Sequence, residues 1–249
     1  MNKLYKKNEV TFAIIMIVIY VVGTSVAEAL SAEIGIEKLI PAVFHVLFSA
    51  FILIWVKKNG LTAKYGLFLP KYNLKHVWFF IPLVVVAGSG FIGGVKLNYS
   101  AFETVLFVIS MICVGFLEEI IFRGFLFKGM AKNNLRAAII VSSVTFGIGH
   151  IVNLFNGKHL FETSMQIVFA VAVGFVLVIL FCKGKSLIPC IVFHSLNNSL
   201  SAFEKSNEEV AEMFSVSTMR FEITVIAVLV AILAVYGIFL SKNTKPVED

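Results

Sequence analysis

The sequence predicts an all-α fold: a polytopic membrane bundle of about eight transmembrane helices with both termini in the cytoplasm. Of its 249 residues, 59% are hydrophobic and only 14% are charged, whereas a soluble domain carries roughly a quarter charged residues. The apolar residues form long runs, and a helix needs about 20 of them to cross the hydrocarbon core. Strands of a membrane barrel would instead be short and would alternate apolar with polar residues.

Eight apolar segments are predicted to span the membrane. They cover residues 10–29, 39–56, 77–95, 102–128, 136–155, 161–182, 186–203 and 219–240. Only five prolines occur in the chain, so most runs can stay helical. Because no soluble domain or internal repeat is evident, residues 1–249 are predicted to form one integral-membrane domain.

The distribution of Lys and Arg supports this count. With the N-terminus inside, fifteen fall in inside segments: Lys3, Lys6, Lys7, Lys57, Lys58, Lys64, Lys71, Lys75, Lys128, Lys132, Arg136, Lys183, Lys185, Lys242 and Lys245. Five fall outside: Lys38, Lys96, Lys158, Lys205 and Arg220. Cytoplasmic loops carry the excess of Lys and Arg, so a multi-pass protein of the inner or plasma membrane is predicted. The dispersed charges indicate contact with the lipid bilayer and no nucleic-acid partner.

The first segment has a second interpretation. Its lysines, apolar core and small residues around Ala27 and Ala29 resemble a cleaved signal peptide. The apolar core is longer than most signal peptides allow, so a retained anchor is expected.

Ionisable side chains inside three of these segments are the candidates for function. Each costs roughly 2.5–3.5 kcal/mol to insert, so such residues usually serve a purpose. They are Glu118, Glu119 and Arg123 in segment 102–128, His150 in segment 136–155, and His194 with Asn197 and Asn198 in segment 186–203. A rise of 1.5 Å per residue puts all three groups at depths of roughly 12–21 Å from the cytoplasmic side. The three helices could therefore bring them together.

Helical spacing then suggests partners. Glu119 and Arg123 are four residues apart, with the acid first, which favours an ion pair on one face. Glu118 points about 100° away and is left for another partner. His194 and Asn198 share a face, as do Phe146 and His150, whereas Asn197 is expected to face elsewhere.

This set of residues suits the hydrolysis of a peptide bond. The reaction needs an activated water and a stabiliser for the tetrahedral oxyanion. Glu118 is the candidate general base, His150 would polarise the water or act as the acid, and His194 and Asn198 would donate to the oxyanion. Alternatively, Glu118, His150 and His194 could hold one zinc ion. The sequence lacks HExxH, so the choice between zinc and no metal stays open.

Three short motifs resemble the CAAX protease and bacteriocin-processing family, also called the Abi family. The family pattern EExxxR, FxxxH and HxxxN is found here as Glu118-Glu119 with Arg123, Phe146 with His150, and His194 with Asn198. The similarity covers about residues 105–202. It implies a bundle of about eight spans and an intramembrane endopeptidase, either glutamate-dependent or a metallo-enzyme, of the type II CAAX prenyl protease kind. It also implies that Glu118 and His150 activate water, that His194 and Asn198 form the oxyanion site, and that Glu119, Arg123 and Phe146 support them.

The resemblance suggests a peptide or membrane-protein substrate: CAAX-type trimming, processing of a bacteriocin or signalling peptide, or self-immunity. Two other functions stay open, a proton-coupled transporter and a non-catalytic scaffold or immunity protein of the same fold. Glu28 and His45 match no motif and are expected to serve packing. Cys113, Cys182 and Cys190 are expected to be small packing residues. The sequence does not indicate the oligomeric state.

Overall fold

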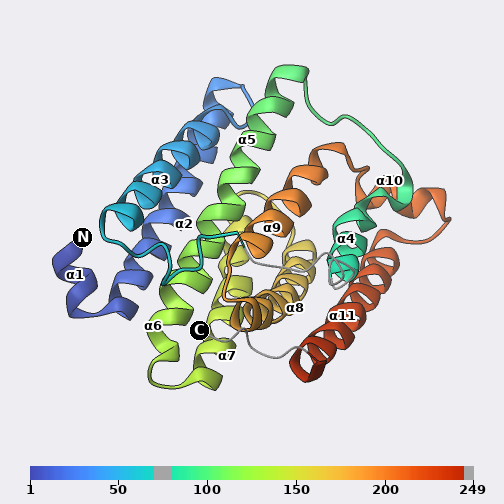
Figure 1. The fold of residues 1–249 in the computed structure, drawn as a ribbon. Coiled ribbons are helices and arrows are strands. Elements are labelled where there is room, and N and C mark those ends of the chain that lie inside the picture. The colour runs from blue at the N-terminus through green and yellow to red at the C-terminus, as the bar shows by residue number, and fades with distance from the viewer. Residues whose placement is uncertain (70–79, 244–249) are drawn as a thin grey trace.

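The computed structural model describes residues 1–69 and 80–243, and within them it is a helical bundle without named strands (Figure 1). The α-helices are α1 (Asn2–Lys7), α2 (Glu9–Ile34), α3 (Leu39–Lys58), α4 (Ile81–Gly88), α5 (Ala101–Glu118), α6 (Lys128–Ala131), α7 (Leu135–Ile148), α8 (Leu160–Gly184), α9 (Ile188–Leu200), α10 (Asn207–Met213) and α11 (Thr218–Asn243). Short 3-10 helices are η2 (Ser89–Gly93), η4 (Gly149–Leu154) and η5 (Ser201–Phe203), and η3 (Glu119–Phe127) is a π-helix. The all-α prediction is confirmed.

Six helices in the described residues are long and apolar enough to cross a membrane. They are Glu9–Ile34, Leu39–Lys58, Ala101–Ala131, Leu135–Leu154, Leu160–Gly184 and Thr218–Lys242. The chain is therefore a multi-pass membrane protein, but the predicted count of eight is not confirmed. Predicted segment 77–95 lies partly outside the described residues, and its described part is the short apolar helix Ile81–Gly93. Predicted segment 186–203 contains α9, which has only 13 residues.

The helix Ala101–Ala131 is the centre of the bundle. Of its most apolar 18 residues, 50% are buried, against 28–44% of the corresponding residues in the other five helices. Its middle, η3, is a π-helix of nine residues, all of them buried. Segments of π-helix are rare and often mark functional sites. The π-helix begins at Glu119, directly after Glu118.

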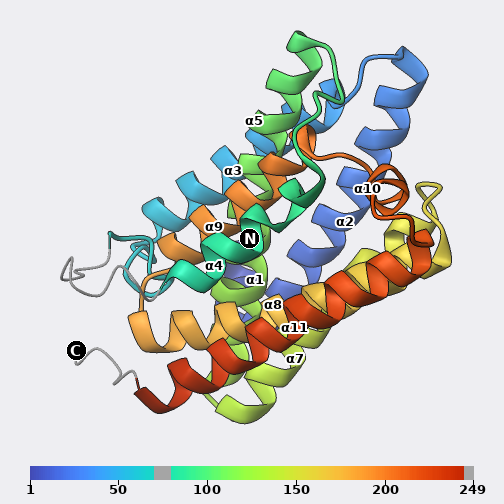
Figure 2. The same ribbon diagram turned by 90° about the vertical axis from the view of Figure 1, so that its right-hand side faces the viewer.

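Close helix crossings bring the motif-bearing helices together. A Cβ atom on Gly115 of α5 would lie 2.6 Å from the backbone nitrogen of Ser195 in α9, so only glycine fits this crossing. Ser195 also donates a 3.1 Å hydrogen bond to the Ile112 carbonyl. Likewise, a Cβ on Gly147 of α7 would lie 2.9 Å from the backbone nitrogen of Val171 in α8. Small residues allow such close approach inside membranes. Helix α8 packs in turn against α11, which lies along the outside of the bundle (Figure 2).

Contacts between helix ends define what we call the lysine end of the bundle. Glu9, at the start of α2, pairs with Lys64 at 2.8 Å and with Lys132 after α6 at 2.6 Å. The amide of Leu187, before α9, donates to the Gly66 carbonyl at 2.8 Å. The start of α2, the loop after α3, the end of α6 and the turn from α8 to α9 therefore lie at one end.

The opposite end, which we call the glutamate end, joins the remaining turns. The backbone amide of Glu37, after α2, donates to the Glu103 carboxylate at the start of α5 at 3.1 Å. Lys96, before α5, pairs with Glu209 of α10 at 2.7 Å. The helices thus run alternately between a lysine end and a glutamate end, as the distribution of basic residues predicts. Which end faces the cytoplasm stays a prediction.

Candidate active site

The predicted ion pair between Glu119 and Arg123 is present in the core of the bundle. The Arg123 Nη1 atom lies 3.0 Å from Glu119 Oε1, and both side chains have no exposed surface. The guanidinium also lies 4.1 Å from the ring centroid of Phe146, a cation–π contact. A buried charge without a partner would cost several kcal/mol, so each charge stabilises the other.

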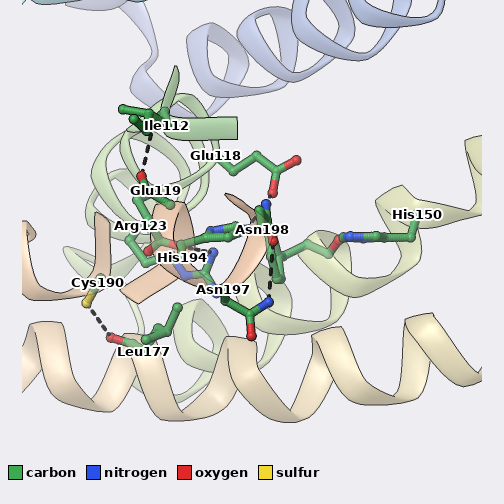
Figure 3. A network of polar contacts seen from close by, with 12 residues as sticks. Ile112, Glu118, Glu119, Arg123, His150, Leu177, Cys190, His194, Asn197 and Asn198 are labelled. Atoms are coloured by element: carbon green, nitrogen blue, oxygen red, sulfur yellow. Dashed lines mark hydrogen bonds and ion pairs between the residues drawn. The ribbon is translucent and has the colours of Figure 1, made fainter. Parts of the chain in front are cut away.

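His194 lies between the two adjacent carboxylates. Its Nδ1 atom is 2.9 Å from Glu119 Oε1, and its Nε2 atom is 3.3 Å from Glu118 Oε2. Glu118 and Glu119 point in different directions from the helix, yet both reach one imidazole because its two nitrogens lie on different edges. Figure 3 shows His194 beside Glu119 and Arg123, with Glu118 on the other side of the ring.

Both ring nitrogens of His194 therefore contact carboxylates. The role expected for His194, that of an oxyanion donor, stays a prediction. The partner that helical geometry left open for Glu118 includes this same imidazole.

Sequence reasoning missed Tyr20, the second partner of Glu118. The Tyr20 hydroxyl donates a 2.7 Å hydrogen bond to Glu118 Oε1. Tyr20 is buried in α2, far from the three motifs in sequence. The signal was available: a tyrosine inside an apolar span needs a partner for its hydroxyl. The sequence could not say which one.

Phe146 separates the two histidines of the motifs. Its ring makes edge contacts with His150 and His194, each at 5.6 Å between centroids. His150 lies just beyond α7, in the 3-10 helix η4, and its Nδ1 atom is 3.3 Å from the Phe146 carbonyl. In Figure 3 His150 lies to one side of the carboxylates rather than within their network. The phenylalanine of the second motif thus supports Arg123, His150 and His194 together.

The two asparagines of α9 face one cavity, which corrects the expectation for Asn197. The Asn197 amide donates to Asn198 Oδ1 at 3.4 Å, and both residues line the cavity described next. The paired contact uses the Asn198 oxygen and leaves its Nδ2 as the donor that can serve another group.

A cavity of about 930 Å³ lies beside the carboxylates and imidazoles. Glu118, His150 and Asn198 line it, together with Tyr20 and Phe146, whereas His194 lies behind Glu118 and is not part of the lining. A volume of this size lies at the upper end of the range for small-molecule sites, enough for a short peptide segment.

The residues without a motif have structural partners. His45 also lines the cavity, but its two ring nitrogens contact Thr24 at 3.0 Å and Ser110 at 2.9 Å. Glu28 pairs with Lys38. A packing role for Glu28 and His45 stays a prediction. The three cysteines form no disulfide.

The alternative of a zinc site needs three ligands grouped around one ion. Within residues 1–69 and 80–243, no three His, Cys, Asp or Glu side chains are grouped so that they could hold one metal ion. Of the proposed ligands, His194 has both nitrogens against carboxylates, and His150 has its Nδ1 atom 3.3 Å from the Phe146 carbonyl. A mechanism with or without a metal stays a prediction.

The helices of this membrane bundle bring two adjacent carboxylates and two imidazoles together at or beside one cavity. Residues 100–200 match the family model described as type II CAAX prenyl endopeptidase Rce1-like. This part of the chain is therefore similar to a family of CAAX-type intramembrane endopeptidases. No curated protein and no solved structure matches the chain. The matched region contains all three motifs, whereas Tyr20 lies outside it.

Proposed function

We propose that the protein hydrolyses a peptide bond of a membrane-associated protein or peptide within the bilayer, with Glu118 as the general base. One observation supports this most directly: Glu118 lines the cavity while Tyr20 and His194 hold its two carboxylate oxygens. A carboxylate fixed in this way has one orientation toward a water molecule in the cavity. General bases of this kind contribute typically 10²–10⁴-fold to rate.

The reaction would proceed as follows. Glu118 takes a proton from water while the water oxygen attacks the carbonyl carbon of the substrate. The amide nitrogen of Asn198 donates to the oxyanion that forms, while the Nε2 atom of His150 orients and polarises the attacking water. The proton on Glu118 then passes to the nitrogen of the leaving amine as the C–N bond breaks, which restores the carboxylate.

His194 is proposed as a positioning residue. It contacts Glu118 through one nitrogen and Glu119 through the other, and Arg123 neutralises Glu119. The chain Arg123–Glu119–His194–Glu118 thus fixes the base through three contacts. Phe146 packs against this chain from one side. CAAX-type trimming, maturation of a bacteriocin or signalling peptide, and self-immunity through peptide cleavage are all reactions for which this site would serve.

The test uses the purified protein in liposomes with a farnesylated CAAX peptide as the first probe and a set of unprenylated membrane peptides as the second. Glu118→Gln keeps the shape of the side chain and its contact with Tyr20 but removes the base. We expect cleavage to fall at least 100-fold with unchanged thermal stability. Glu33→Gln, at an exposed position of α2, is the matched control and should cleave normally. Full activity in Glu118→Gln would exclude this carboxylate as the base.

A further inference from the structure

The cavity occupies only one half of the bundle. In α2, which starts at the lysine end, the lining residues run from Tyr20 to Ala32, near the opposite end. In α5, which starts at the glutamate end, they are Phe107, Met111, Val114 and Glu118. Helices α8, α9 and α11 follow the same rule and line the cavity only with their halves at the glutamate end. The cavity therefore extends from mid-bundle to the glutamate end.

From Glu118 toward the lysine end, the next residues of the central helix are buried. Beyond Glu118 the chain enters the π-helix Glu119–Phe127, which is buried throughout. Leu117, Ile120 and Ile121 have no exposed surface. Phe122 and Phe146 form the apolar floor of the cavity next to Glu118. A peptide reaching Glu118 from the lysine end would have to displace this packing, whereas one from the glutamate end would enter existing space.

The two ends differ in charge. Among described residues outside the core, the lysine end carries twelve Lys and Arg: Lys3, Lys6, Lys7, Lys57, Lys58, Lys64, Lys128, Lys132, Arg136, Lys183, Lys185 and Lys242. The glutamate end carries five, together with nine carboxylates against only Glu9 at the lysine end: Glu28, Glu33, Glu37, Glu103, Glu162, Glu204, Glu208, Glu209 and Glu212. Because an excess of Lys and Arg marks cytoplasmic loops, the lysine end faces the cytoplasm by this rule.

We infer that the cavity opens to the extracytoplasmic side of the membrane and that the substrate is a peptide segment exposed on that side. Such a segment is either an exported peptide or the outer flank of a membrane-spanning protein. That a substrate enters the cavity rests on the proposed function. The direction of opening rests only on the residues that line the cavity and on the distribution of charge between the two ends. Glu28, Glu37 and Glu204 line the cavity near its opening, against Lys38 and Lys158. The excess of carboxylates favours neutral or basic segments over acidic ones.

The direction of opening can be tested by thiol labelling in intact cells. Asn156→Cys introduces a thiol at an exposed residue that lines the cavity near the glutamate end. Lys57→Cys introduces one at the lysine end, at a residue equally exposed, and the unmodified chain gives the background of its three native cysteines. We expect a membrane-impermeant maleimide to label Asn156→Cys in intact cells and Lys57→Cys only after permeabilisation.

The opposite pattern, with Lys57→Cys labelled in intact cells and Asn156→Cys only after permeabilisation, would overturn the inference. If Asn156→Cys fails to accumulate, labelling of Lys158→Cys, in the same loop, tests the same direction of opening. Labelling needs no catalytic activity, so this result stands even if the protein cleaves nothing.

A second measurement connects the opening with the substrate. Right-side-out vesicles should cleave a basic membrane-flanking peptide added to the outer solution, and inverted vesicles should not until they are made leaky. A large maleimide on Ser201→Cys, inside the cavity, should reduce that cleavage at least tenfold. Cleavage in inverted vesicles alone would contradict the inference while leaving the proposed hydrolase function intact.

Discussion

The hydroxyl of Tyr20 donates a 2.7 Å hydrogen bond to Glu118, although 98 positions separate the two residues in the chain. The bond joins the first spanning helix to the centre of the motif-bearing helix. Since only residues 100–200 match the family model, this contact brings a side chain from outside the matched region to the proposed base. It gives the first of four predictions.

Removal of the Tyr20 hydroxyl should slow catalysis without loosening the fold. Tyr20→Phe keeps the ring but leaves Glu118 Oε1 without its donor. A hydrogen bond to a charged group contributes roughly 1.5–3 kcal/mol, so we expect kcat to fall about tenfold or more with little change in KM. Steady-state cleavage by the reconstituted protein measures both constants. Tyr99→Phe, away from the base, should behave as the unmodified chain, and an unchanged kcat in Tyr20→Phe would exclude a role for the hydroxyl.

The buried Arg123 should be required for folding as well as for activity. Arg123→Met leaves the Glu119 carboxylate buried without its cation, which costs about 3–5 kcal/mol. We expect low accumulation and a lowered thermal midpoint in detergent. The double variant Glu119→Gln with Arg123→Met removes both charges and should recover much of the stability while staying inactive. A single variant as stable as the unmodified chain would mean that another group compensates Glu119.

The glycine at the crossing of α5 and α9 should control how His194 is positioned. Gly115→Ala would bring a Cβ atom to 2.6 Å from the Ser195 backbone nitrogen, so α9 must shift and carry His194 away from Glu118. We expect loss of most cleavage activity together with a lower thermal midpoint. Gly88→Ala is the control, because a Cβ atom there meets nothing within 4 Å. Equal activity of the two variants would show that the crossing tolerates the shift.

Removal of metal ions should leave cleavage unchanged. Both ring nitrogens of His194 are committed to carboxylates, and the described residues offer no group of three metal ligands. Dialysis against a strong chelator, followed by elemental analysis and a cleavage assay, tests this expectation. A stoichiometric metal whose loss abolishes cleavage and whose return restores it would contradict the metal-free mechanism.

Much of the architecture followed from the sequence. Long apolar runs predicted the six confirmed helices, because the requirement to cross the bilayer acts on each segment separately. The i,i+4 spacing predicted the pair of Glu119 and Arg123, since both residues lie on one helix. Two predicted spans were less accurate. Segment 186–203 contains α9, a helix of only 13 residues, and the described part of segment 77–95 is the short helix Ile81–Gly93.

The sequence by itself determined which helices form and which polar side chains they carry into the membrane, because helix formation and insertion depend on neighbours along the chain. Only the tertiary structure decided that one imidazole contacts both carboxylates, that Tyr20 reaches Glu118, and that the cavity extends toward the glutamate end. These relationships depend on how closely separate helices approach one another. That approach is set by packing at crossings such as Gly115 with Ser195, which no local pattern specifies.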